Sequence, residues 1–214
     1  MKKLSVVIVS YNARQYLGPC IRSVEQAMKG IDGEIIVVDN QSSDGTVEDL
    51  KAHFPQVQVV ESGGNIGFAK ANNIGIRLSH SPYVLLLNPD TVVGANTLRQ
   101  TVDFMEQHPQ VGAAGVQMLN ADGTRAPESR RGRPTALVAL YKMCGLARLF
   151  PNSHRFARYY MSWLSWSEPA EIDVISGAFA MLRRKALDQV GLLDEDFFMY
   201  GEDIDLSCRL LDAG

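Results

Sequence analysis

The chain has few cysteines, and none of them occurs in a spacing typical of a disulfide framework or a zinc site. Its three cysteines, Cys20, Cys144 and Cys208, lie far apart, are odd in number and form no C-x-x-C pair. A disulfide framework needs paired cysteines, and a structural zinc ion needs ligands at close spacing. The sequence therefore favours a protein of a reducing cytoplasm without structural zinc.

Long apolar runs and an excess of positive charge are lacking as well. No apolar stretch approaches the roughly 18 residues of a membrane-spanning helix. The apolar stretch that begins at Leu4 is interrupted by Ser5 and ends at Ser10, so it predicts a strand rather than a signal peptide. A net charge of -3 and a pI near 5.8, without an aromatic-basic RNA-binding motif, argue against nucleic acid as a partner. We expect a cytoplasmic protein, either free or at the cytoplasmic face of a membrane.

Strand-like and helix-like patterns alternate along the first half of the chain. A helical example is the apolar set Leu17, Ile21, Val24 and Met28. Such alternation is typical of right-handed βαβ units, and it predicts an α/β fold with a mainly parallel sheet flanked by helices on both faces. A length of 214 residues with 46% hydrophobic content suits one domain. The expected strands lie near 4–9, 34–38, 57–61, 83–87 and 111–118, and the expected helices near 14–29, 45–53, 67–79 and 94–107.

Polar residues follow three of the expected strands at the point where each strand ends. Ser10 follows the first strand, Asp39 follows the second, and Asn88-Pro89-Asp90 follows the fourth. Ligands of open α/β sheets bind beyond the carboxyl ends of the strands, so a lone carboxylate such as Asp90 could hold a metal ion there. The alternative is a simple turn, because Asn, Pro and Asp all favour turns for local backbone reasons. The residues by themselves leave both interpretations open.

Two further segments allow both a functional and a structural interpretation. The glycine-rich loop 63–67 precedes a helix, so its backbone amides could meet an anion, although it is no G-x-G-x-x-G motif and loop flexibility also explains it. Glu202, Asp203 and Asp205 begin an amphipathic C-terminal helix. An acid there could serve as a general base, yet acids in a first turn also stabilise a helix by about 0.3–1 kcal/mol.

Five short segments of the chain form an ordered set. They are Ser10-Tyr11-Asn12, residues 37–46, Asn65-Ile66-Gly67-Phe68, Leu87-Asn88-Pro89-Asp90, and residues 200–206. These segments occur in the order seen in glycosyltransferase family 2, and the chain resembles the rhamnosyltransferase-like branch of that family from residue 4 to about 214. The resemblance implies a GT-A (Rossmann-like) fold, a dTDP- or UDP-sugar donor, Mg²⁺ or Mn²⁺, and inversion at the anomeric carbon. It also implies a nucleotide-sugar-binding half, 1–120, and an acceptor-binding half, 121–214, which we expect to be incomplete at its C-terminus.

The resemblance also implies roles for single residues. Asp90 is the expected metal ligand, and Asn88 replaces the first acid of the Asp-x-Asp pair common in the family, where it could still bond a ribose hydroxyl. Asp203 aligns with the catalytic base, and Glu202 is the reserve candidate. Asp39 would accept a hydrogen bond from the pyrimidine ring. The other residues expected to bind the nucleotide are Ser10, Tyr11 and Asn12, which would line the base pocket, together with Asn65 and Gly67.

Residues 125–158 depart from the charge pattern of the rest of the chain. They contain eight basic residues and one acidic residue, Glu128, interleaved with apolar and aromatic residues that continue to Trp166. This pattern predicts a basic amphipathic segment, 125–166, that contacts an anionic membrane. The alternative is a mobile acceptor loop whose arginines meet a sugar diphosphate or solvent.

The expected function is metal-dependent, inverting transfer of a sugar, such as rhamnose or another hexose, to a saccharide or lipid-linked saccharide in cell-envelope polysaccharide synthesis. One alternative is a nucleotide-sugar pyrophosphorylase, which would have a Gly-rich loop with Arg and Lys after the first strand, where this chain has residues 10–14, Ser-Tyr-Asn-Ala-Arg. A second alternative is a non-catalytic module that binds nucleotide sugars.

Overall fold

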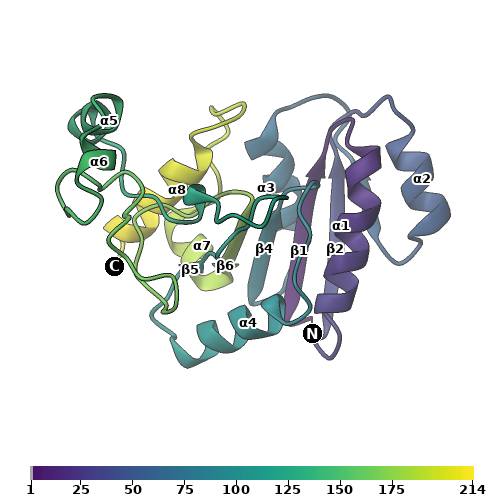
Figure 1. Ribbon diagram of the computed structural model, residues 1–214. Helices are drawn as coiled ribbons and strands as arrows, with labels where there is room; N and C mark the ends of the chain where they lie inside the picture. Colours follow the sequence, from purple (N-terminus) through teal and green to yellow (C-terminus); the bar gives the residue numbers. More distant parts are fainter. Residues whose placement is uncertain (1) are drawn as a thin grey trace.

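The computed structural model describes residues 2–214, and within them a six-stranded sheet has the strand order β3-β2-β1-β4-β6-β5 (Figure 1). The first four strands in sequence are parallel, β6 is antiparallel to β4, and β5 is antiparallel to β6. Every residue of β1 and β4 is buried, as expected for strands covered on both faces. The strands are β1 (Leu4–Ser10), β2 (Gly33–Asp39), β3 (Gln58–Glu61), β4 (Tyr83–Leu87), β5 (Ala113–Ala114) and β6 (Phe179–Arg183).

Helices cover both faces of this sheet (Figure 1). One core cluster joins the sheet to α1 (Arg14–Ala27), α2 (Thr46–His53) and α4 (Thr97–Gln107). A second cluster joins the opposite face to α3 (Phe68–Leu78), α7 (Arg184–Val190) and α8 (Glu202–Asp212). The predicted α/β fold with helices on both faces is therefore confirmed.

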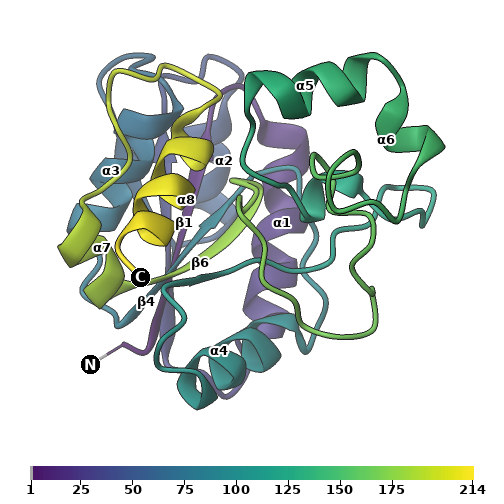
Figure 2. The ribbon, with the colours of Figure 1, turned by 90° about the vertical axis from the view of Figure 1, so that its left-hand side faces the viewer.

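The segment between β5 and β6 lies largely apart from the sheet. It contains the short 3-10 helix η1 (Pro127–Ser129) and the helices α5 (Ala136–Met143) and α6 (Leu146–Leu149). Figure 2 shows α5 and α6 at one corner of the molecule, away from α3, α7 and α8. Among residues 2–214, no helix combines the length and the apolar character needed to cross a bilayer.

The predicted strand 111–118 is wrong in its extent and in its neighbour. Only Ala113 and Ala114 pair within it, and they pair with β6, which returns antiparallel from the second half of the chain and inserts between β4 and β5. The apolar run 111–118 is interrupted by Gly112 and Gly115, which have no side chain to pack and weaken a strand. The other four predicted strands and the four predicted helices of the first half are confirmed to within a few residues.

Candidate active site

The tips of β1 and β2 place two unpaired polar atoms side by side. Ser10 and Asp39 are register partners, and their residues are 0% and 2% exposed. Asp39 Oδ2 accepts a hydrogen bond from the Ser42 amide at 2.8 Å, whereas Asp39 Oδ1 and Ser10 Oγ are buried and have no hydrogen-bond partner within residues 2–214. A buried polar atom without a partner costs free energy. These two atoms are therefore suited to a ligand that supplies the missing hydrogen bonds.

The loop after β1 forms the wall beside these atoms. Asn12 has a left-handed backbone (φ 50°), which asparagine tolerates better than most residues. Its amide donates to Ser42 Oγ at 2.9 Å, and its Oδ1 accepts from the Ser43 amide at 2.8 Å. Asn12 thus ties the loop after β1 to the loop after β2. Tyr11 remains 51% exposed, so its ring is accessible to a ligand.

Asn40, a residue that the sequence analysis missed, attaches the loop 62–67 to the tip of β2. Its Oδ1 accepts hydrogen bonds from the Ile66 amide at 3.0 Å and from Ser62 Oγ at 3.2 Å, and its Nδ2 donates to Asn65 Oδ1 at 2.9 Å. Asn40 is 3% exposed. A buried amide with three bonds acts as a fixed strut. No pattern in the sequence distinguishes it from an ordinary turn asparagine.

Several backbone amides of the loop 62–67 have hydrogen-bond partners within the protein, whereas the sequence analysis expected that the amides of residues 63–67 could meet an anion. The amides of Asn65, Ile66, Gly67 and Phe68 donate to Gln41 Oε1, Asn40 Oδ1, Asn65 Oδ1 and the Phe198 carbonyl, respectively. These donors are therefore already used within the protein, and the prediction for residues 63–67 is wrong for the amides of Asn65, Ile66 and Gly67. Nucleotide binding by Asn65 and Gly67 through other atoms stays a prediction.

The tip of β4 presents the predicted metal ligand to solvent. The Asn88 amide donates to the Ala178 carbonyl at 3.2 Å, and the Asn88 carbonyl accepts from Thr91 Oγ1 at 2.7 Å, so the turn is fixed through its backbone. The Asp90 side chain is exposed and makes no hydrogen bond or ion pair within the described structure. Its carboxylate is thus free to bind a ligand.

The residues around Asp90 suit a metal ion that is bound together with a substrate. Residues 2–214 contain no cluster of three or more His, Cys, Asp or Glu side chains that could hold a metal ion. The nearby Cys20 is fully buried, and this burial raises the pKa of its thiol to about 11. Mg²⁺ commonly binds through one or two carboxylates together with substrate phosphates. A single carboxylate at this edge fits that mode of binding.

Asp203 and Glu202 begin α8 next to the segment that enters β6, and their environments differ. Asp203 forms an ion pair with Arg131, and its Oδ2 also accepts from the Gly177 amide at 3.4 Å. Because Ala178 bonds the tip of β4, this contact puts Asp203 at the same edge of the sheet as Asn88. The Asp203 side chain is 20% exposed. It is therefore within reach of a ligand at that edge.

Glu202 is more deeply enclosed than its neighbour. The residue is 5% exposed, and its Oε2 is buried without a hydrogen-bond partner in the described structure. Burial raises the pKa of the Glu202 carboxyl, the Asp203 carboxylate raises it further, and the Arg131 guanidinium opposes the rise. Of the two acids, Asp203 is thus the more exposed to solvent.

Most basic side chains of the segment 125–158 contact aromatic rings, carbonyl oxygens or acids of the protein itself. The sequence analysis left open whether they meet a membrane, a sugar diphosphate or solvent. The guanidinium carbon of Arg130, Cζ, lies 3.5 Å from the Trp166 ring centroid, and Arg130 Nη1 donates to the Ser165 carbonyl at 3.2 Å. Lys142 lies 3.6 Å from the Tyr159 ring centroid. The ion pairs of this segment are Arg131–Asp203, Arg133–Asp212 and Arg158–Asp173.

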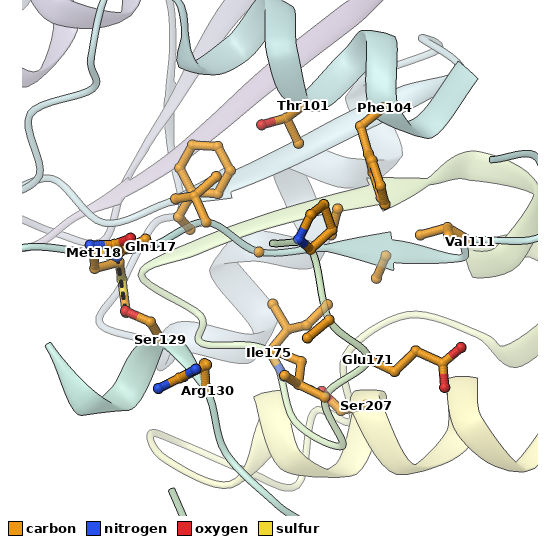
Figure 3. A pocket seen from close by; sticks show the side chains of 18 of the residues that line it. Thr101, Phe104, Val111, Gln117, Met118, Ser129, Arg130, Glu171, Ile175 and Ser207 are labelled. Carbon is orange, nitrogen blue, oxygen red and sulfur yellow. Dashed lines mark hydrogen bonds between the residues drawn. The ribbon is translucent and has the colours of Figure 1, made fainter. Parts of the chain in front are cut away.

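A cavity of about 2070 Å³ extends from Asn88 and Asp90 along the outer side of β5. Figure 3 shows Thr101 and Phe104 of α4 on one side, Ser207 of α8 on the other, and Arg130 near the end where Ser129 Oγ accepts from the Met118 amide. Residues of the predicted acceptor-binding half thus line a space that reaches the tip of β4.

A comparison with protein families identifies the family of the chain. The sequence profile described as Glycosyl transferase family 2 matches residues 5–191. The chain belongs to glycosyl transferase family 2. It is a glycosyltransferase, which confirms the resemblance that the five sequence segments gave.

Curated relatives of this glycosyltransferase include enzymes of known activity. The N-acetylglucosaminyl-diphospho-decaprenol L-rhamnosyltransferase of Mycobacterium tuberculosis is 30% identical over 224 residues, which cover 99% of this chain and 71% of the relative. The low-salt glycan biosynthesis hexosyltransferase Agl10 of Haloferax volcanii is 28% identical over 210 residues, or 96% of this chain and 61% of that protein.

Solved structures share the fold at lower identity. The mannosyltransferase PcManGT of Pyrobaculum calidifontis, in complex with GDP-Man and Mn²⁺, superposes with a TM-score of 0.67 at 19% identity, covering 98% of this chain and 52% of that one. Residues 1–349 of TarS of S. aureus, in complex with UDP-GlcNAc, superpose with a TM-score of 0.65 at 18% identity, covering 98% and 53%. The chain spans about half the length of these solved proteins, and the GT-A-like α/β fold is confirmed.

Proposed function

We propose that this glycosyltransferase catalyses inverting, metal-dependent transfer of a sugar, such as rhamnose or another hexose, from a dTDP- or UDP-sugar to a saccharide or lipid-linked acceptor of a cell-envelope polysaccharide. The observation on which the proposal depends is the buried, unpaired Oδ1 of Asp39 at the tip of β2. The similarity to a rhamnosyltransferase that acts on a decaprenol-linked sugar supports the donor and acceptor classes.

Asp39 suits recognition of a base that presents a ring N–H. Uracil and thymine donate from N3, and guanine donates from N1, whereas cytosine and adenine present a ring acceptor at the corresponding position. A carboxylate oxygen only accepts, so Asp39 Oδ1 matches the first group and repels the second. Ser10 Oγ lies beside it and can donate or accept toward the same ring, and the exposed Tyr11 offers a stacking face.

Asp90 and Asn88 would serve the diphosphate end of the donor. When bound, Mg²⁺ or Mn²⁺ would neutralise negative charge that develops on the departing diphosphate. The exposed Asp90 carboxylate supplies a charged oxygen ligand, and the Asn88 amide can bond a ribose hydroxyl without adding charge. With one protein carboxylate, affinity for the metal should be low until the diphosphate supplies further oxygens.

Asp203 would act as the general base. The acceptor oxygen forms a bond to the anomeric carbon while its proton passes to Asp203. The bond between the anomeric carbon and the diphosphate oxygen breaks at the same time, and its electron pair leaves with the diphosphate. Because attack and departure are in line, the configuration inverts. Asp203 suits this role better than Glu202, because the Glu202 residue is only 5% exposed.

A membrane-contacting surface would bring a lipid-linked acceptor to this site. The face of α5 and α6, called the α5–α6 face, exposes large apolar side chains next to the exposed cation Arg148, a combination that favours an anionic bilayer. Sedimentation with phosphatidylglycerol vesicles should show binding that Met143→Glu weakens and that the control Leu78→Glu, on α3, leaves unchanged. The apolar residues of the α5–α6 face are Leu137, Leu140, Met143, Leu149 and Phe150.

The donor is tested by calorimetry with UDP, dTDP, GDP, CDP and their sugars, with and without Mn²⁺, followed by an assay for released nucleoside diphosphate. We expect metal-dependent binding of the uracil or thymine nucleotides and turnover of one sugar. Binding of CDP equal to that of UDP would contradict the role of Asp39. Failure to bind any nucleotide would contradict the proposed function, and binding without release of nucleoside diphosphate would favour the non-catalytic module.

A further inference from the structure

Arg131 connects the segment before α5 to the start of α8. Its guanidinium forms the ion pair with Asp203 across 72 residues of sequence, and its Nη2 also donates to the Ile175 carbonyl at 3.1 Å. The Arg131 side chain is 19% exposed. Its backbone is fixed as well, since Arg131 forms an antiparallel bridge with Val174, whose amide donates to the Arg131 carbonyl at 2.9 Å. Arg131 is therefore held at both its backbone and its guanidinium.

Ile175, whose carbonyl accepts the hydrogen bond from Arg131, is in turn hydrogen-bonded to α8. The Ile175 amide donates to Ser207 Oγ at 3.1 Å, and Ser207 Oγ donates to the Asp203 carbonyl at 2.6 Å. The Gly177 amide reaches Asp203 Oδ2 at 3.4 Å. These bonds form one closed network around the Asp203 carboxylate.

The two oxygens of Asp203 have different surroundings in this network. Oδ2 accepts from both Arg131 and Gly177, whereas Oδ1 accepts only from the Ile204 amide, at 2.8 Å. A carboxylate oxygen can accept about two hydrogen bonds. Oδ2 is therefore saturated, and Oδ1 retains the free lone pair.

Among residues 2–214, Asp203 forms a salt bridge with no cation other than Arg131. The small cavity beside Asp203 is lined by apolar residues, Ser207 and the two acids Glu202 and Asp203 themselves. The next acid of α8, Asp205, is paired with Arg209 at 2.7 Å. Within residues 2–214, Arg131 is thus the cation recorded in contact with Asp203, and it also opposes the raised pKa of Glu202.

We propose that Arg131 is a positioning residue for the transfer reaction, which fixes Asp203 through Oδ2 so that Oδ1 takes the proton from the acceptor hydroxyl. This inference depends on the proposed function, because it presupposes that Asp203 is the base. Arg131 acts through Asp203 and needs no contact with either substrate. Its removal should therefore lower kcat while leaving donor binding unchanged.

A double-mutant cycle separates this role from a merely structural one. The four proteins are wild type, Arg131→Met, Asp203→Asn and the double variant, assayed for nucleoside diphosphate released from the nucleotide sugar with the highest turnover in the panel. Arg131→Met should lower kcat about 10- to 100-fold, as loss of a residue that orients a catalytic group does. When Arg131→Met is added to Asp203→Asn, kcat should fall by no more than about 3-fold further, because both substitutions remove the same function of the Asp203 carboxylate.

Two further variants are the controls. Arg131→Lys keeps the charge and should restore part of the kcat. Arg133→Met removes an arginine two positions away, which pairs with Asp212 on the surface at 3.1 Å, and should leave kcat and donor affinity within about 2-fold of wild type. Donor affinity is measured by calorimetry for every variant, and folding is checked by thermal melting.

The outcomes separate failure of the inference from failure of the proposed function. Normal kcat in Arg131→Met, or losses that multiply in the double variant, would overturn the inference while the function stands. An equal fall of donor affinity and kcat would overturn it too. If wild type turns over no donor, the proposed function fails, and the inference falls with it. If Asp203→Asn is fully active, Asp203 is not the base, and the inference falls while the transfer activity stands.

Discussion

Asp39→Asn should reverse the base preference of the donor pocket. Asp39 Oδ2 accepts from the Ser42 amide at 2.8 Å, and an asparagine keeps this bond only by turning its own oxygen toward Ser42. The amide nitrogen then replaces Oδ1 at the position that is buried and unpaired. One substitution therefore changes the pocket atom from an acceptor to a donor.

The expected magnitude follows from the lost hydrogen bond. A hydrogen bond to a charged group contributes about 1.5–3 kcal/mol, so UDP or dTDP should bind roughly 10- to 150-fold more weakly. CDP should gain affinity, because the ring N3 of cytosine accepts from the new amide. The melting temperature of the ligand-free variant should not fall, since a neutral amide is less costly to bury than a carboxylate.

Calorimetry with UDP and CDP on both proteins measures this reversal directly. Glu61→Gln is the matched control, because Glu61 is the register partner of Asp39 on β3 but its side chain is 62% exposed and pairs with Lys51 at the surface. The control should bind both nucleotides as wild type does. An Asp39→Asn variant that melts normally and keeps the wild-type ratio of UDP to CDP affinity would refute the assignment of Asp39.

Five further substitutions test other parts of the structure. Asp90→Ala should abolish the Mn²⁺ dependence of nucleotide affinity in calorimetry. A variant that keeps full metal-dependent binding would show that a residue other than Asp90 binds the metal. Asp203→Asn should keep donor affinity and lower turnover about 100-fold or more, because proton transfer matters only in the transition state. Burial raises the pKa of Glu202, so ionisation of this carboxyl is less favourable in the folded than in the unfolded protein. The folded state is therefore more stable while Glu202 is protonated, and this stability is lost as the pH rises through the folded pKa. Glu202→Gln should therefore melt at a higher temperature than wild type at pH 7, with the difference vanishing below the ordinary pKa of about 4.5. Gly75→Ala would place a Cβ against the Val7 side chain of β1 and should lower the free energy of unfolding in urea by about 1–3 kcal/mol. Gly18→Ala, in α1, would place a Cβ 3.4 Å from the nearest neighbouring atom, Arg22 Nη2, and should raise the free energy of unfolding by up to about 1 kcal/mol.

The first half of the fold followed from local patterns. The run 83–87 is apolar at every position, and a strand buried on both faces requires that pattern, so β4 and the turn after it were predictable. The same holds for α1, whose apolar residues recur at helical spacing. The polar residues at strand ends, including Asp39 and Asp90, were found for the same reason.

The second half was not predictable in this way. β6 inserts between β4 and β5, and its place depends on pairing with residues about 100 positions earlier rather than on its own five-residue pattern. The arginines of 125–158 suggested an outward-facing basic segment. The structure instead places several of them against aromatic rings and acids of distant segments.

The sequence by itself determined the type of domain and the family, because periodicity, turn residues and five short segments are properties of neighbouring residues. Only the tertiary structure decided which oxygen of Asp39 lacks a partner, that the amides of Asn65, Ile66 and Gly67 are already paired, and that Arg131 forms an ion pair with Asp203. Burial and pairing arise when distant segments pack together, and the local order of residues does not specify them.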